Sequence, residues 1–250
     1  MSKTIFSQYG RYVMEKLEKA VSTQENAVQA AADLIFSAQS NGNRWYIEGS
    51  GHSHMLAEEV FSRAGGYVQV TPMLEPELML HEHPMKSTYL ERLPGYGKIL
   101  LDLYHVSAGD VITLVSNSGR NVLPVELAMG AKERGAKVIA ITNTTHSLQT
   151  SSRHPSGKKL MDIADIVLDN CGDYGDAAFQ IPGFTHKIGA TSTAIGAFLI
   201  QALVAEVIER FVAAGKEPDV FVSSNLDGSD LRNKQLMEAC VNRYGSEHTI

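Results

Sequence analysis

The run Val111-Ile112-Thr113-Leu114-Val115, followed by Ser116-Asn117-Ser118-Gly119-Arg120-Asn121, decides the fold class of this 250-residue chain. The apolar and β-branched run predicts a buried strand, and the hydroxyl- and glycine-rich stretch after it predicts a tight turn. The turn leads into a helical pattern over residues 121–134, with Asn121 expected to cap the helix and Gly135 to end it. Strand, polar turn and helix in this order direct backbone N–H groups and a positive helix end at an anion.

A similar unit lies earlier in the chain. Residues 44–48 predict a strand, Gly49-Ser50-Gly51-His52-Ser53-His54 predict a second hydroxyl-rich turn, and residues 53–64 predict a helix that ends at Gly65. Two such turns in one α/β unit predict a phosphate site built mostly from neutral donors.

Strands and helices alternate along the rest of the chain. The patterns predict further strands over residues 67–70, 137–141, 166–168 and 220–222, and further helices over residues 6–40, 194–214 and 229–244. Residues 71–97, which carry four prolines, and residues 169–189 are expected to form long loops. Such alternation is typical of a parallel sheet covered on both faces, with ligands at the carboxyl ends of the strands.

No internal repeat or linker divides the chain, so we expect one domain over residues 1–250. It is expected to consist of an N-terminal helical region (1–42), an α/β core (43–215) and a C-terminal extension (216–250).

The composition narrows the class of partner. The formal net charge is −6 and no Lys/Arg-rich run occurs, which argues against nucleic-acid binding because that needs a basic surface. Charged residues interrupt the apolar pattern of residues 194–214, which therefore predicts a buried helix and no membrane span. Neither Cys171 nor Cys240 lies in a C-x-x-C pair, and the N-terminus lacks a long apolar run, so we expect a cytoplasmic protein.

Two other kinds of site fit the sequence less well. Gly49-x-Gly51 after a strand is typical of a dinucleotide site, but the third glycine would fall at His54, and no acidic residue ends the strand expected over residues 67–70. The histidines of the first turn and of the 71–97 loop follow too loose a pattern to predict a metal site: His52, His54, His81 and His83. We therefore expect neither a cofactor nor a bound metal.

Three polar turns together resemble the SIS (sugar isomerase) domain. They are Gly49-Ser50-Gly51-His52-Ser53, Ser116-Asn117-Ser118-Gly119 and Gly189-Ala190-Thr191-Ser192-Thr193, the last of which opens the long apolar helix. The runs Asn143-Thr144-Thr145-His146-Ser147 and Ser152-Arg153-His154-Pro155-Ser156-Gly157-Lys158 are similar to one branch of that family, which is often labelled phosphoheptose isomerase by analogy. The resemblance covers nearly the whole chain.

The resemblance implies a three-layer αβα sandwich around a five-stranded, parallel, flavodoxin-like sheet. It also implies that a sugar phosphate, a heptose or hexosamine phosphate, lies across the strand ends with its phosphate on the Ser-x-Ser-Gly turn. SIS proteins usually act as dimers or tetramers, so we expect a homodimer or homotetramer. The residues expected to bind phosphate and sugar are Ser50, Gly51, His52, Ser53, Ser116, Asn117, Ser118, Gly119, Asn121, Thr191 and Ser192. The 169–189 loop offers further polar side chains for sugar hydroxyls: Asp173, Tyr174, Asp176 and Gln180.

Isomerisation of an aldose to a ketose through an enediol needs a carboxylate base and an acid that opens the ring. SIS isomerases place a glutamate on the helix after the first turn. We prefer Glu59 over Glu58 there, since neighbouring residues differ by about 100° around a helix and only one can face the ligand. Glu82 is a second candidate base. His81 and His186 are candidate acids, because the pKa of free histidine is near neutrality.

Two other functions stay open on the same scaffold. β-Elimination from an amino-sugar phosphate would use the same base but would expel a leaving group from C3. A non-catalytic sensor would bind the sugar phosphate and a protein partner without exchanging the proton at C2.

Overall fold

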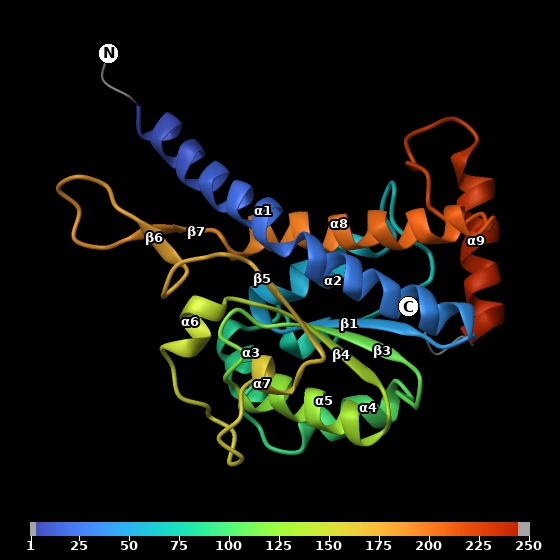
Figure 1. Cartoon of the computed structure of the whole chain (residues 1–250), viewed down its shortest axis with the longest axis horizontal. Coiled ribbons are helices and arrows are strands. Elements are labelled where there is room, and N and C mark those ends of the chain that lie inside the picture. Colours follow the sequence, from blue (N-terminus) through green and yellow to red (C-terminus); the bar gives the residue numbers. More distant parts are fainter. Residues whose placement is uncertain (1–3, 245–250) are drawn as a thin grey trace.

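The computed structural model describes residues 4–244 and consists of a parallel sheet between two layers of helices (Figure 1). The strands of the sheet are β1 (Trp45–Gly49), β2 (Val70–Met73), β3 (Val111–Val115), β4 (Lys137–Thr142) and β5 (Ile166–Asp169). All pairings are parallel, in the order β2-β1-β3-β4-β5. The predicted fold class, a three-layer αβα sandwich with a five-stranded parallel sheet, is confirmed. Residues 1–3 and 245–250, and the side chains of residues 240–244, which include Cys240, lie outside the described residues.

Two groups of helices cover the two faces of the sheet. Helices α1 (Ile5–Ser40), α2 (His54–Val60) and α8 (Ser192–Ala213) form one layer, in which α1 and α8 run side by side (Figure 1). Helices α4 (Tyr96–Leu103) and α5 (Val122–Glu133) cover the other face. The remaining elements are α3 (Pro84–Leu90), α6 (Thr144–Leu148), α7 (Leu160–Ile163), α9 (Ser229–Tyr244) and a hairpin of β6 (Ala177–Phe179) and β7 (Ile188–Ala190).

Side-chain alternation along β1 divides the core in two. Trp45 and Ile47 belong to the core beneath α1 and α8, whereas Tyr46 belongs to the core beneath α4 and α5. The Trp45 indole donates a hydrogen bond of 2.9 Å to the hydroxyl of Thr113 on β3. Burying an aliphatic side chain such as Ile47 contributes about 1.5–3 kcal/mol. Because β1 buries side chains in both cores, packing on both faces of the sheet holds it in place.

The register of β1 against β3 positions the two polar turns. Gly49, the last residue of β1, lies opposite Val115, the last residue of β3, so both turns leave the same edge of the sheet. The chain turns so tightly after Gly49 that a Cβ there would lie 2.4 Å from the carbonyl oxygen of Ser53. Only glycine fits at this position, because real Cβ atoms do not approach backbone so closely.

The strand expected over residues 67–70 is wrong in its position. β2 covers Val70–Met73, and Tyr67 instead forms an isolated antiparallel bridge with Val220. That bridge is the only β-bridge of Val220 in the described part of the chain, so the strand-like piece expected over residues 220–222 pairs with the segment around Tyr67 without forming a strand. Pro72 is tolerated within β2 because this strand forms the edge of the sheet.

The long loops expected from the prolines contain regular elements. Residues 71–97 hold most of β2, the 3₁₀ turn Pro76–Leu78, α3 and the start of α4. Pro84 begins α3 at the first helical position, where its missing N–H costs nothing. The carboxylate of Glu126 accepts hydrogen bonds from the N–H groups of Gly95 and Gly97 and so caps α4.

The helix after the first turn, α2, is shorter than the helix expected over residues 53–64, because it ends at Val60.

Candidate functional site

The two polar turns and the start of α8 meet at the carboxyl edge of the sheet. A small pocket there is lined by residues of all three: His52, Ser53, Leu56, Val115, Asn117, Ile141, Asn170, Ser192 and Thr193. The structure thus brings together His52, Ser53, Asn117 and Ser192, four of the residues expected to bind a ligand. The strand order reverses at β1, and ligands of open parallel sheets bind at such a reversal.

The turn after β3 is held by hydrogen bonds within the turn and by bonds to the residues that follow β4 and β5. The hydroxyl of buried Ser116 accepts a hydrogen bond from the N–H of Gly119 at 3.2 Å. The Asn117 carbonyl accepts the N–H of Asn143 at 3.0 Å, and the Asn117 side chain accepts the amide of Asn170 at 2.8 Å. The turn is therefore rigid before any ligand binds. The hydroxyl of Ser118 makes no hydrogen bond among residues 4–244 and is available as a donor.

Asn121 does not cap α5 as expected. It occupies the N-cap position, but its side chain makes no bond to the helix and instead accepts the guanidinium of Arg153 at 2.6 Å. Arg120 lies in the same turn and donates to the hydroxyl of Ser151 at 3.3 Å. Burial and the nearby guanidinium groups of Arg92 and Arg120 lower the pKa of Arg153. Two guanidinium groups, of Arg120 and Arg153, thus lie at the start of α5, where the sequence predicted mostly neutral donors.

The turn after β1 forms a 3₁₀ turn, Gly51–Ser53, in which the N–H of Ser53 donates to the carbonyl of Ser50 at 3.1 Å. Gly51 has a φ of 60°, which favours glycine. The Ser50 hydroxyl donates to the carboxyl of Glu48 at 3.2 Å, so it is engaged by the protein itself.

Glu48 is a buried carboxyl group that the sequence analysis missed. Its side chain lies beneath the first turn, only 1% exposed, on the same side of the sheet as Tyr46. Burial, with a smaller contribution from the charge of Glu91, raises the pKa of Glu48 to about 8, and the Ser50 hydrogen bond opposes this. The period-two pattern of β1 would have placed Glu48 on the same inward face as Tyr46.

His54 is buried at the start of α2. Its Nδ1 lies 3.3 Å from a carboxylate oxygen of Glu58, and burial lowers its pKa. A shallow pocket beside it, with a volume of about 200 Å³, is lined by three histidines, His52, His54 and His81, together with Glu58. Among residues 4–244, no three His, Cys, Asp or Glu side chains converge as a metal site.

The N-terminus of α8 is occupied by a side chain from the 169–189 segment. The carboxylate of Asp176 accepts the N–H groups of Thr191 and Ser192, each at 3.0 Å, and the Ser192 hydroxyl at 2.6 Å. Asp173, in contrast, accepts the hydroxyl of Tyr12 on α1 at 2.8 Å and lies 2.7 Å from the Lys16 ammonium. The N–H of Thr191 and both donors of Ser192 are thus engaged by a carboxylate of the chain, whereas the Thr191 hydroxyl is not.

The four candidate catalytic residues are not brought together. Glu59 forms an ion pair with Arg63 and accepts the side-chain amide of Gln201 at 3.1 Å. Glu82 is paired with Lys86 on the surface. His81 is exposed beside the shallow pocket, and His186 is exposed between β6 and β7, where its ring lies 5.8 Å from that of Phe184.

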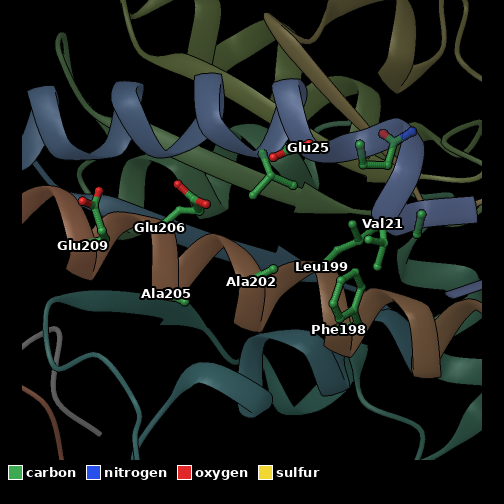
Figure 2. A pocket seen from close by; sticks show the side chains of 11 residues that line it. Val21, Glu25, Phe198, Leu199, Ala202, Ala205, Glu206 and Glu209 are labelled. Carbon is green, nitrogen blue, oxygen red and sulfur yellow. The ribbon is translucent and has the colours of Figure 1, made fainter. Parts of the chain in front are cut away.

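A larger groove lies away from the strand ends, between α1 and α8. Figure 2 shows this groove, of about 520 Å³, with Val21 and Glu25 on α1 and Phe198, Ala202 and Glu206 on α8. Its floor is apolar and its rim is acidic, which does not suit a phosphate. No described helix is both long enough and apolar enough to cross a membrane.

A parallel sheet with this strand order, and hydroxyl-rich turns at its reversal point, defines the class of protein. The chain belongs to the SIS domain family, whose model matches residues 8–143. The family expected from the three turns is therefore confirmed.

Relatives of known sequence include proteins named UPF0309. The chain is 51% identical over 236 residues to UPF0309 protein BH3325 of Halalkalibacterium halodurans, covering 94% of this chain and 98% of that one. It is 43% identical over 233 residues to UPF0309 protein TTE0306 of Caldanaerobacter subterraneus, covering 92% and 95%.

Solved structures of low sequence identity share the fold. A phosphoheptose isomerase of Francisella tularensis matches with a TM-score of 0.54 at 17% identity, over 83% of this chain and 100% of that one. The sugar isomerase domain of an RpiR transcription factor of Sphaerobacter thermophilus matches at 0.52 and 20% identity, over 96% and 99%. The Vibrio vulnificus NanR protein, complexed with ManNAc-6P, matches at 0.52 and 14% identity, over 96% and 69%. Enzymes and regulators are thus both among the proteins of this fold.

Glu48 generates a prediction about stability and pH. Its pKa is raised in the folded state, so the native chain keeps a proton that the unfolded chain loses above about pH 4.5. Its contribution to stability is therefore complete below that pH and is lost progressively as the pH rises toward about 8. Glu48→Gln should match the wild type in urea unfolding near pH 5 and become progressively more stable than it toward pH 8.

Glu133→Gln, which removes an exposed carboxyl group from α5, controls for the loss of one charge. A constant stability difference between Glu48→Gln and the wild type from pH 5 to pH 8 would mean that Glu48 ionises as readily in the folded state as in the unfolded one.

Proposed function

We propose that this protein binds a sugar phosphate at the carboxyl edge of its sheet and isomerises the sugar through an enediol. The observation that carries the proposal is the Ser118 hydroxyl, which is unbonded among residues 4–244 on a rigid turn ahead of α5. A dianionic phosphate suits a helix N-terminus, a free hydroxyl and nearby guanidinium groups, here those of Arg120 and Arg153. A heptose or hexosamine phosphate is the proposed substrate, and the cytosol the proposed location.

Membership of the SIS family supports this ligand class. Proteins that share the fold include one named as a phosphoheptose isomerase and one complexed with ManNAc-6P. The proposed phosphate site uses the turn after β3 with Ser116, Asn117, Ser118 and Gly119, and the turn after β1 with Gly51, His52 and Ser53.

In the proposed reaction, written for a heptose phosphate with a hydroxyl at C2, a carboxylate removes the proton from C2 of the open-chain aldose phosphate and an enediol forms. Protonation at C1 then gives the ketose phosphate. Glu59 and Glu82 are the proposed bases, and His81 and His186 the proposed acids for ring opening. In the conformation described, Glu59 is held by Arg63 and Gln201, so it must leave these partners to reach a substrate.

Ser118→Ala tests the phosphate site. A hydrogen bond to a charged group is worth about 1.5–3 kcal/mol, so the variant should bind a hexosamine or heptose phosphate about 10- to 100-fold more weakly in titration calorimetry. Binding of the unphosphorylated sugar should not change. Ser107→Ala, which removes a hydroxyl far from the strand ends that donates to Asp110, serves as the control. Equal losses for phosphorylated and free sugar would contradict phosphate binding at Ser118.

Glu59→Gln and Glu82→Gln test the base. Glutamine keeps the shape of the side chain but accepts no proton, so replacing the true base should slow deuterium exchange at C2 at least about tenfold while phosphate affinity stays the same. Glu58→Gln, on the same helix, is the control for Glu59→Gln.

Exchange at C2 also separates the two other functions. A lyase would exchange this proton and release the group at C3, whereas a sensor would bind the sugar phosphate without exchange. Wild-type exchange rates in both variants would show that neither glutamate is the base.

We also propose that the protein assembles as a homodimer or homotetramer through the groove between α1 and α8. Val21 on α1 is 55% exposed at this apolar groove, and Met14 and Phe6 are exposed on the same helix. Such a surface is stabilised when a second chain covers it.

Val21→Asp places a charge on the proposed interface and should lower the mass measured by light scattering toward 27.2 kDa, the mass of one chain. Val212→Asp, at a residue of α8 that is 60% exposed and does not line the groove, should leave the wild-type mass unchanged. A wild-type mass of 27.2 kDa at micromolar concentration would contradict the assembly.

A further inference from the structure

The N-terminus of α8 already binds an anion, which the chain itself supplies. Both carboxylate oxygens of Asp176 are engaged there: Oδ1 accepts the N–H groups of Thr191 and Ser192, and Oδ2 accepts the Ser192 hydroxyl. α8 has 22 residues, and the N-terminus of so long a helix carries a partial positive charge that favours anions. Three donors converging on one carboxylate form a complete site for an oxyanion.

Thr191 adds a buried hydroxyl without a partner to this helix end. It is the N-cap residue of α8 and is 0% exposed, yet its hydroxyl makes no hydrogen bond among the described residues. A buried hydroxyl without a partner is costly. Both carboxylate oxygens of Asp176 already accept hydrogen bonds from the other three donors. A phosphate group has a further oxygen, which could accept a hydrogen bond from the Thr191 hydroxyl.

The segment that carries Asp176 is fixed independently of this contact. Asp173 binds the Tyr12 hydroxyl at 2.8 Å and the Lys16 ammonium at 2.7 Å. The N–H of Gly175 donates to Nδ1 of His146 at 3.0 Å. Gly175 and Asp176 have φ values of 82° and 65°, a left-handed turn that aims the carboxylate at the helix. Loss of the Asp176 charge therefore leaves two anchors of this segment in place.

The same helix end borders the pocket at the strand ends. Ser192 and Thr193 of α8 line that pocket together with Asn117, which belongs to the turn of the proposed phosphate site. An anion at α8 and a phosphate on the turn that carries Asn117 would thus both border this small pocket.

We propose that the N-terminus of α8 is a second anion-binding site, filled by Asp176 in the free protein and taken over by an acidic group of the ligand. The ligand class that follows is a sugar phosphate with a second anionic group, a carboxylate or a second phosphate. This class rests on the proposed function, while the α8 site itself does not.

Titration calorimetry with inorganic phosphate at low ionic strength tests the proposal, with Ser118→Ala as the background so that the turn after β3 contributes least. Adding Asp176→Asn removes the competing charge and keeps an oxygen that can cap the helix. We expect phosphate to bind at least about fivefold more tightly to Ser118→Ala/Asp176→Asn than to Ser118→Ala, since the helix end then faces no internal anion. Adding Ser192→Ala to the double variant should reverse most of this gain.

Ser118→Ala/Asp173→Asn is the matched control, because it removes the same charge from the same segment, from a carboxylate that binds Tyr12 and Lys16 and, within residues 4–244, makes no hydrogen bond to the N-terminus of α8. Its phosphate affinity should stay within about twofold of that of Ser118→Ala, because a screened charge acts weakly over a distance. Equal affinity with and without Asp176→Asn, accompanied by a lower melting temperature, would show that Asp176 is only a structural cap and would overturn the proposal. An equal gain from Asp173→Asn would overturn it as well.

If the Asp176→Asn chain does not fold, as judged by circular dichroism, Asp176→Ser in the same background provides the comparison, with the same expected and contradicting results. Failure of the proposed function is visible separately. It would appear as equal binding of a sugar phosphate by the wild type and by Ser118→Ala, a comparison in which Asp176 is unchanged.

Discussion

The parallel pairing of β1 with β3 is the constraint on which the rest of the structure depends. It sets Gly49 opposite Val115, so the two hydroxyl-rich turns start side by side at one edge of the sheet. The pairing holds only while β1 stays buried on both faces, with Trp45 bonded to Thr113 in one core and Tyr46 packed in the other. The tight turn after Gly49, which leaves no room for a Cβ, then directs α2 back across the sheet.

This edge of the sheet separates positive from negative charge. Toward α5, Arg120 and Arg153 surround the start of a helix, which favours an anion. Beneath the first turn, Glu48 is buried near Glu91, so an ionised carboxylate is disfavoured there. At α8 the positive helix end is neutralised by Asp176. On the proposed function, an anionic ligand would bind first at the turn after β3 and would compete with Asp176 at α8.

The sequence predicted what depends on local pattern. The strand over residues 111–115, the long helices α1 and α8, and the meeting of the two turns follow from apolar periodicity and from glycine and serine at strand ends. The shift of β2 was not predictable, because Pro72 is allowed only once β2 is known to be an edge strand. The contacts of Asn121 with Arg153 and of Asp176 with Ser192 join residues 32 and 16 positions apart, which no local pattern reports.

The central claim is that the turn after β3 holds the phosphate of a sugar phosphate. A crystal structure of the wild-type protein grown with a heptose or hexosamine phosphate tests it most directly. The account predicts phosphate density within hydrogen-bond distance of the Ser118 hydroxyl and the first N–H groups of α5. Phosphate density elsewhere, for example in the groove between α1 and α8, with the turn after β3 holding only solvent, would contradict it.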